Sequence, residues 1–277
     1  MPKNIKRNKR VKKIILITGS TDGIGLETAK LLASRGQTVL LHGRDPDKLE
    51  LAQKLLSKIS AEVMVDGFLA DLSLMKNVEA MAKAVAKKYR QLDVLINNAG
   101  VYQSPQAITQ DKLDIRFAVN TFAPYVLTQK LMPVLGATAR VINVASAAQS
   151  PVDLAALAGK KTLSDEFNAY AQSKLALIMW SGQLACAIKD KGPTIITVNP
   201  GSLLGTKMVQ KGFGVAGKDV RIGADILSRL ALEDEFANMS GQYFDNDAKR
   251  FSSPHKDALD VSKSEQLVRV MEEILAL

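Results

Sequence analysis

Residues 14–25 read Ile-Ile-Leu-Ile-Thr-Gly-Ser-Thr-Asp-Gly-Ile-Gly, an apolar strand that runs into a glycine-rich turn. A helix is predicted to follow at 24–34. Glycines let the backbone approach a pyrophosphate closely, and the N-terminus of the next helix attracts its negative charge. The spacing is Gly-x-x-x-Gly-x-Gly, which a plain tight turn also satisfies. Its place after the first strand of a β-α-β unit favours a dinucleotide site.

Short apolar strands alternate with amphipathic helices along the rest of the chain, as in a parallel sheet covered on both faces. The 277 residues contain no internal repeat and no long linker. We therefore predict the α/β class, with a single-domain Rossmann-type doubly wound parallel sheet of about seven strands and helices on both faces. The expected strands are 14–18, 38–42, 62–69, 93–97, 140–144, 194–198 and 242–244; the expected helices are 24–34, 46–59, 74–89, 118–135, 165–189, 222–232 and 262–275.

Composition favours a globular protein without a membrane span. Apolar residues make up 47% of the chain, and no apolar run approaches the ~20 residues that a membrane helix needs. No signal-peptide core follows the charged N-terminus. The single cysteine, Cys186, excludes an internal disulfide and suits a reducing compartment. The cytoplasm is therefore the expected location.

The net charge of +9 is concentrated at the N-terminus. Removing the seven basic residues before Ile14 leaves about +2, an ordinary surface with no basic footprint for duplex binding. We expect a solvated, partly disordered basic tail at 1–12 and one domain with a C-terminal extension at 13–277. No nucleic-acid partner is expected, although the tail leaves contact with anionic lipid or nucleic acid open. The basic residues are Lys3, Lys6, Arg7, Lys9, Arg10, Lys12 and Lys13.

Tyr170 and Lys174 lie four residues apart in a predicted helix, so their side chains share one face. A neighbouring ammonium favours the phenolate and lowers a tyrosine pKa from its usual value near ~10. We therefore expect Tyr170 to exchange protons near neutral pH. Ser146 ends the apolar run 140–146. Together with the glycine turn, these residues indicate a nicotinamide-dependent enzyme that interconverts a carbonyl and an alcohol.

From Lys13 to about Met208 the chain resembles the short-chain dehydrogenase/reductase family. The likeness rests on motifs that occur in order and at the family's spacing: the glycine turn, Asp71, Asn97-Asn-Ala-Gly100, Asn120, Ser146, the Tyr170/Lys174 pair and Asn199-Pro-Gly201. The stretch from Gly223 to His255 also resembles bacterial relatives of the retinol dehydrogenase-like branch. One departure is Ala145, where the family often has a first serine before the catalytic one.

The resemblance implies a role for each catalytic position. Tyr170 would exchange a proton with the reacting oxygen, while Lys174 would lower the pKa of Tyr170 and bind the nicotinamide ribose. Ser146 would donate a hydrogen bond to the reacting oxygen as charge develops. Asn120 would hold a water that links Lys174 to solvent. The hydride moves on the cofactor, so no metal is expected, and a homodimer or homotetramer is implied.

The resemblance also implies the cofactor contacts. Asp71 would accept a hydrogen bond from the adenine amine, Asn98 to Gly100 would line the adenosine, and Pro200-Gly201 would approach the nicotinamide. The full expected set is Gly19, Ser20, Thr21, Gly23, Ile24, Gly25, Arg44, Asp71, Leu72, Asn98, Ala99, Gly100, Tyr170, Lys174, Pro200 and Gly201. The family commonly has a nicotinamide-binding threonine four residues beyond the last glycine. Thr206 comes five beyond it, which leaves this contact open.

The end of the second strand favours NADP(H) over NAD(H). Family members that use NAD generally carry an acid there, where this chain has Gly43. Arg44 can pair with a 2′-phosphate bidentately, and Thr21 could add a hydroxyl donor. Asp22 argues the other way, because many NADP-using relatives have a base at that place.

The segment 202–218 occupies the family's position for a flap over the substrate. It combines apolar side chains with four glycines that would let it close, which suits a small lipophilic aldehyde, ketone or alcohol. A surface loop whose apolar residues pack locally is the alternative. The apolar residues are Leu203, Leu204, Met208, Val209, Phe213 and Val215, and the glycines are Gly205, Gly212, Gly214 and Gly217.

One alternative function and one histidine remain to be considered. A non-catalytic NADP(H)-binding regulatory protein could use the same scaffold, although it would be expected to lose Tyr170, Lys174 or Ser146. His42 ends the second apolar strand, where a hydrogen-bonded structural histidine is expected rather than a ligand.

Overall fold

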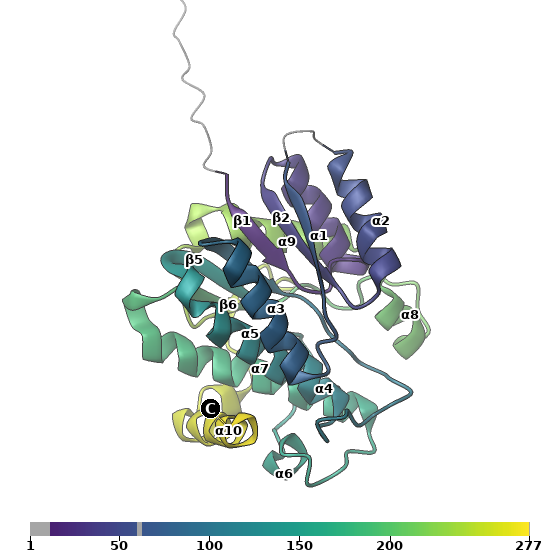
Figure 1. Cartoon of the computed structure of the whole chain (residues 1–277). Coiled ribbons are helices and arrows are strands. Elements are labelled where there is room, and N and C mark those ends of the chain that lie inside the picture. The colour runs from purple at the N-terminus through teal and green to yellow at the C-terminus, as the bar shows by residue number, and fades with distance from the viewer. Residues whose placement is uncertain (1–11, 60–62, 277) are drawn as a thin grey trace, which may run out of the picture.

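The apolar runs form the strands of one sheet, in the order β3-β2-β1-β4-β5-β6-β7-β8 (Figure 1). The computed structural model describes residues 12–59 and 63–276, and the fold is described for these residues. Each neighbouring pair is parallel except β7 and β8, which are antiparallel. The strands are β1 (Ile14–Ile17), β2 (Thr38–Gly43), β3 (Val65–Leu69), β4 (Leu92–Asn97), β5 (Leu135–Val144), β6 (Thr194–Asn199), β7 (Tyr243–Asp245) and β8 (Arg250–Ser252).

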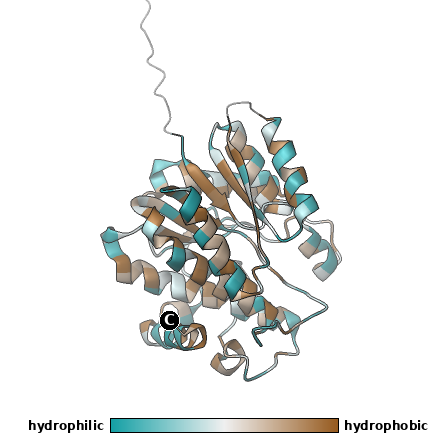
Figure 2. Cartoon of the chain, viewed as in Figure 1, coloured by the Kyte–Doolittle hydropathy of each residue, from teal (hydrophilic) through white to brown (hydrophobic). Residues whose placement is uncertain are grey.

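Helices cover both faces of this sheet. Ile15 and Ile17 of β1 pack in a core with α1 (Gly23–Ser34), α2 (Pro46–Ser57) and α9 (Arg221–Leu232), while Leu16 points to the opposite face. The opposite face is covered by α3 (Met75–Lys88), α5 (Ala123–Leu131) and α7 (Glu166–Ile188), and α10 (Val261–Leu275) packs on α7. Figure 2 shows apolar strands between amphipathic helices. The predicted α/β fold with a doubly wound parallel sheet is confirmed.

Aspartates start the helices that carry the predicted site. The Asp22 carboxylate accepts the Gly23 N–H at 2.9 Å and caps α1. Asp165 accepts the N–H groups of Phe167 and Asn168 at 3.0 and 3.1 Å and so begins α7 a turn before Tyr170. These caps satisfy N–H groups that have no partner within the helix.

The structure differs from the predicted elements in several places. β5 begins at Leu135 rather than at 140, because Leu135 pairs with Leu92 of β4. The preceding helix begins earlier, at α4 (Ile115–Phe117), and includes a π-helical turn, Ala118–Phe122, before α5. Two short helices were not predicted, α6 (Leu154–Leu157) and α8 (Lys207–Phe213), nor was β8. The start of the predicted strand 62–69 and most of the basic tail, residues 1–11, lie outside the described residues.

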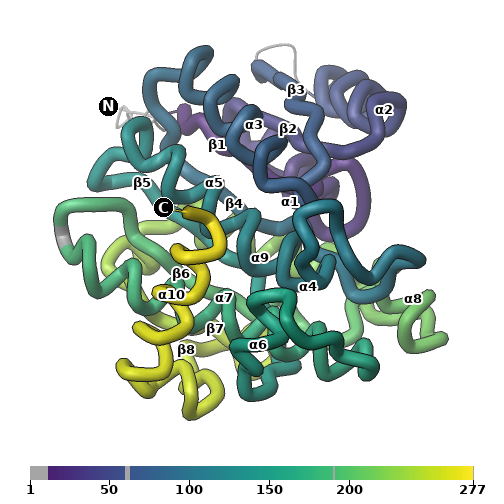
Figure 3. The backbone as a smooth tube through the Cα atoms, turned by 60° about the horizontal axis from the view of Figure 1, so that its bottom comes forward, coloured from purple at the N-terminus to yellow at the C-terminus, as the bar shows by residue number. Residues whose placement is uncertain are grey.

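The carboxyl ends of the parallel strands meet at one edge of the sheet. The strand order reverses between β1 and β4, which places the loops after these strands on either side of a crevice where ligands bind in such folds. The short helices α4, α6 and α8 lie beyond this edge (Figures 1 and 3). None of the helices within the described ranges is long and apolar enough to cross a membrane.

Candidate functional site

The glycine turn leaves no room for side chains at two positions. A β-carbon at position 25 would overlap the Gly19 carbonyl oxygen, and one at position 19 would lie 2.9 Å from the Ala99 Cα. Gly19 also adopts a left-handed φ of +63°, which favours glycine. The N-terminus of α1 therefore packs directly against the turn, which itself packs on the loop after β4. This close approach of backbone suits a pyrophosphate.

The loop after β4 is hydrogen-bonded to this turn. The Asn98 side-chain amide donates to the carbonyls of Thr18 and Gly19 at 2.9 and 3.1 Å. The Thr18 hydroxyl accepts the N–H groups of Asn98 and Ala99, both at 3.0 Å. The structure thus brings Asn98, Ala99 and the glycine turn together, and the Asn98 side chain already has partners that hold the turn in place.

The end of β2 presents a free guanidinium. Arg44 is exposed and makes no hydrogen bond or ion pair with the described part of the chain. A β-carbon at position 43 would lie 2.6 Å from the Thr21 methyl, so Thr21 fills the space that a side chain at this position would need. Lys48 of α2 is paired with Asp45 at 3.6 Å. The chain thus has a free cation, Arg44, directly after the residue that packs on Thr21.

Three expected cofactor contacts differ in their burial. Asp71 is exposed at the end of β3, where its carboxylate accepts the Ser73 N–H at 2.9 Å, and Leu72 is buried. Ser20 is fully buried. Its N–H donates to the His42 carbonyl at 3.0 Å and its hydroxyl oxygen accepts the His42 N–H at 2.9 Å. Ser20 therefore holds the glycine turn to the end of β2.

Tyr170, Lys174 and Ser146 come together at the carboxyl end of β5. The Lys174 ammonium lies 5.7 Å from the centre of the Tyr170 ring. It is buried and donates to the Val144 carbonyl at 2.7 Å. Ser146 is the second residue after β5, and its side chain is within hydrogen-bonding reach of Tyr170. The three predicted catalytic side chains thus share one small volume.

The expected lowering of the Tyr170 pKa is wrong for this structure. Burial raises the pKa of Tyr170, and the hydrogen bond with Ser146 offsets only part of that shift. Burial likewise lowers the pKa of Lys174, to about 8. The ammonium bonds to the Val144 carbonyl rather than to the phenol oxygen, so the pairing inferred from helical spacing is not made.

Asn120 lies in the π-helical turn and holds the backbone of Val101. Its side-chain oxygen accepts the Val101 N–H at 2.8 Å, and its amide donates to the Val101 carbonyl at 2.9 Å. The amide also donates to the Ser173 hydroxyl at 2.9 Å, and this hydroxyl donates to the Tyr170 carbonyl at 2.7 Å. The Asn120 side chain therefore connects the loop after β4 with the helix that carries Tyr170. π-Turns are frequent at functional sites.

Tyr102 is a site residue that sequence reasoning missed. It is buried, its ring meets Tyr170 edge-on at 5.4 Å, and it stacks on Phe213 of α8 at 5.2 Å. Phe213 meets Phe167 of α7 edge-on at 6.4 Å. A β-carbon at Gly212 would lie 2.5 Å from the Tyr102 ring, so α8 packs tightly on it. The one available signal was its position directly after Asn97-Asn-Ala-Gly-Val101.

The segment 202–218 connects the glycine turn with this aromatic cluster. The Thr206 hydroxyl accepts the Val209 N–H at 3.2 Å and caps α8, and a β-carbon at Gly23 would lie 3.4 Å from its methyl group. Lys207 forms an ion pair with Asp22. At the base of the segment, Asn246 donates to the Pro200 carbonyl at 2.9 Å. Thr206 therefore lies against the phosphate end of the expected cofactor path.

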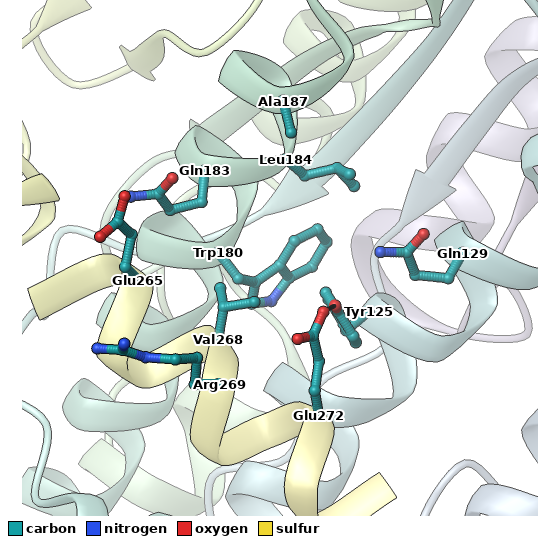
Figure 4. Close-up of a pocket in the computed structure, with 10 residues that line it drawn as sticks. All are labelled: Tyr125, Gln129, Trp180, Gln183, Leu184, Ala187, Glu265, Val268, Arg269 and Glu272. Atoms are coloured by element: carbon teal, nitrogen blue, oxygen red, sulfur yellow. Dashed lines mark hydrogen bonds between the residues drawn. The ribbon is translucent and has the colours of Figure 1, made fainter. Parts of the chain in front are cut away.

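A separate hollow of about 400 Å³ lies between α5, α7 and α10 (Figure 4). None of the predicted site residues lines it. Its floor is apolar around Trp180, and on one wall Tyr125 donates to Glu272 at 2.9 Å. Within the ranges that the structure describes, no group of three or more His, Cys, Asp or Glu side chains is placed to hold a metal ion.

Comparison with known proteins gives the family. The family model described as short chain dehydrogenase matches residues 13–213. Retinol dehydrogenase 13 of Mus musculus is 30% identical over 269 residues, which cover 91% of this chain and 80% of the relative. Retinol dehydrogenase 12 of Homo sapiens is 33% identical over 278 residues, which cover 96% and 87%. The chain therefore belongs to the short chain dehydrogenase family and is an oxidoreductase acting on CH–OH donors.

Solved structures agree with this assignment. A short chain dehydrogenase of Shigella flexneri 2a strain 301, complexed with NADP, aligns with a TM-score of 0.67 and 26% identity. The alignment covers 85% of this chain and 97% of that one. An uncharacterized protein of Mycobacterium paratuberculosis aligns with a TM-score of 0.78 and 26% identity, covering 95% and 92%. An NAD(P)-binding Rossmann fold is thus supported.

Because the Lys174 ammonium is buried, we predict that the free energy of unfolding of the protein depends on pH. The unfolded chain keeps this proton up to about pH 10.5, whereas burial lets the folded protein release it near pH 8. Between these values the unfolded state binds more protons, so rising pH favours the folded state. Relative to Lys174→Met, wild-type stability should rise by up to about 3 kcal/mol from pH 8 to 10.5, as measured by urea unfolding.

Lys76→Met, at an exposed lysine of α3, controls for the loss of one lysine. A difference between wild type and Lys174→Met that stays constant over this range would show that burial does not hold the Lys174 pKa down.

Proposed function

We propose that the chain is an NAD(P)-dependent oxidoreductase that interconverts a carbonyl and an alcohol through Tyr170, Lys174, Ser146 and Asn120, most readily as an NADPH-dependent reductase. The observation that carries the proposal is the meeting of Tyr170, Ser146 and Lys174 beside the glycine turn. Lys174 lies close to both the Tyr170 ring and the loop after β4, since a β-carbon at Gly100 would be 3.5 Å from its Nζ.

The groups present suit this chemistry. When bound, a nicotinamide cofactor supplies or accepts the hydride, so the protein has to hold the reacting oxygen and move one proton. Tyr170 would give the proton to that oxygen or take it back. The Ser146 hydroxyl would donate to the same oxygen as negative charge develops. Lys174 would hold the ribose hydroxyls and, once turned from Val144, bring its charge to the Tyr170 phenol.

Tyr170→Phe should lower kcat by about 10²- to 10⁴-fold and leave the affinity for NADPH nearly unchanged, because the ring remains while the proton donor is lost. NADPH oxidation with a panel of carbonyls measures kcat, and calorimetric titration measures the affinity. Tyr102→Phe is the matched control, since it removes a hydroxyl from the neighbouring ring, and it should keep most of the turnover.

Equal turnover by wild type and Tyr170→Phe would exclude this mechanism. Tight binding of NADPH by a wild-type protein that reduces no carbonyl and oxidises no alcohol would favour the alternative, a non-catalytic regulatory protein on the same scaffold.

Charge and space at the end of β2 support NADP(H) over NAD(H). Position 43 carries no carboxylate that would repel a 2′-phosphate, and Thr21 fills its place. The free Arg44 guanidinium can pair with a phosphate bidentately. Two acidic residues near this place are paired with lysines: Asp22 with Lys207, and Asp45 with Lys48.

Arg44→Asp should raise KM for NADPH by about 10- to 100-fold and change KM for NADH much less, because it replaces a phosphate-binding cation with an anion. Steady-state kinetics with both cofactors measure the change. Arg90→Asp makes the same charge change at an exposed position after α3 and should leave both KM values unaltered. A preserved ratio of the two KM values in Arg44→Asp would show that Arg44 does not bind the phosphate.

The aromatic cover supports a small lipophilic carbonyl or alcohol as substrate. Tyr102 packs on Tyr170 and is joined through Phe213 to Phe167, so aromatic rings lie beside Tyr170, and Lys207 at the start of α8 is paired with Asp22. An apolar wall favours apolar ligands. The retinol dehydrogenases to which the chain is similar are named for a lipophilic alcohol.

Medium-chain and aromatic aldehydes or ketones should therefore have kcat/KM values at least about tenfold above those of small polar or anionic carbonyls. Initial rates of NADPH oxidation over a matched substrate panel measure this preference. A preference for the polar or anionic compounds would contradict the apolar substrate site.

The remaining expectations stay predictions. These are the cytoplasmic location, the homodimer or homotetramer, the absence of a nucleic-acid partner, the domain limits at residues 12 and 13, and all of the expected cofactor contacts, including those of Ile24, Asp71, Leu72, Gly100 and Gly201.

A further inference from the structure

His42 is a buried residue that the proposed mechanism does not use. It is the penultimate residue of β2, with 3% of its surface exposed. Its Nδ1 lies 3.0 Å from the Gly19 backbone nitrogen, and its Nε2 lies 3.1 Å from the Ala70 carbonyl oxygen. The expectation of a hydrogen-bonded structural histidine is therefore confirmed. The identity of the two partners, Gly19 and Ala70, indicates a more specific role for His42.

The partners determine the protonation of the ring. A backbone N–H can only donate, so Nδ1 must accept the hydrogen bond from Gly19 and the ring proton must lie on Nε2, where it donates to Ala70. Only the neutral Nε2–H form makes both bonds. Burial lowers the pKa of His42 to about 4, which keeps this form at neutral pH.

The two partners belong to the two segments that would bind the adenosine half of the cofactor. Gly19 opens the glycine turn, and Ala70 directly precedes Asp71. No hydrogen bond between the described residues joins these two segments to each other directly. The imidazole is therefore the shortest hydrogen-bonded connection between the expected pyrophosphate-binding and adenine-binding loops.

The same bond also defines what Gly19 can do. Its N–H is taken up by His42, so it is not free to donate to a phosphate. The backbone of His42 reinforces this arrangement, because it exchanges hydrogen bonds with the buried Ser20 at 3.0 and 2.9 Å. His42 thus contacts two successive residues of the turn, once through its ring and once through its backbone.

We propose that His42 is a positioning residue for the cofactor: it sets the separation of the glycine turn and the Ala70–Asp71 loop, and through them the affinity for the adenosine half. The proposal rests on the proposed function, because it assumes that a dinucleotide binds at this edge of the sheet. It assigns His42 no contact with substrate or with the reacting atoms.

Two substitutions separate the two bonds. His42→Asn keeps an acceptor near the position of Nδ1 and loses the donor to Ala70, whereas His42→Leu loses both. Calorimetric titration with NADPH and with adenosine 2′,5′-bisphosphate, which lacks the nicotinamide, measures the affinity. The expected Kd increase is about tenfold or more for both probes in His42→Leu and smaller in His42→Asn, with kcat at saturating NADPH within about twofold of wild type.

The control is Tyr89→Phe, which removes a hydrogen bond of 3.0 Å between Tyr89 and Asp66 near the other end of β3. It should lower Tm without changing either Kd. His42 variants that lose stability but bind both probes as tightly as wild type would overturn the proposal, and His42→Asn decides it where His42→Leu does not fold. A wild-type protein that binds neither NADPH nor NADH would instead overturn the proposed function, and the role of His42 with it.

Discussion

The structure depends on a backbone contact that leaves no space for side chains. Between the glycine turn and the loop after β4, β-carbons at positions 19 and 25 would collide with Ala99, the Gly19 carbonyl and the Asn98 amide. Only glycine allows α1 to start this close to the sheet. The contact brings the backbone of the turn next to the loop that leads to Tyr102. The proposed cofactor and substrate sites therefore both depend on this contact.

The second half of the site depends on polar side chains that hold backbone rather than ligand. Asn120 binds both polar groups of Val101, Ser173 links Asn120 to the Tyr170 carbonyl, and His42 holds Gly19. Such groups are costly to bury unless every hydrogen bond is made. These satisfied hydrogen-bond networks hold the backbone around Tyr170 and Lys174, and α8 packs on the neighbouring Tyr102 through Phe213.

The sequence was sufficient for the fold and for most of the site because both follow local rules. Apolar strands, amphipathic helices and the glycine turn each have a period or spacing that can be counted, and Tyr170, Lys174 and Ser146 do meet where predicted. Local patterns could not predict where individual side chains point. Helical spacing placed Lys174 beside Tyr170 but could not show that its ammonium bonds to Val144. Nor could it reveal Tyr102, whose importance comes from contacts with α7 and α8.

The central claim is that the glycine turn and the end of β2 form one dinucleotide site together with Tyr170, Ser146 and Lys174. A crystal structure of the wild-type protein with NADPH tests it most directly. We expect the pyrophosphate over the N-terminus of α1, the 2′-phosphate on Arg44 and Thr21, and the nicotinamide between Tyr170 and Pro200-Gly201. NADPH bound elsewhere on the chain, or in this crevice with its nicotinamide remote from Tyr170, would contradict the account.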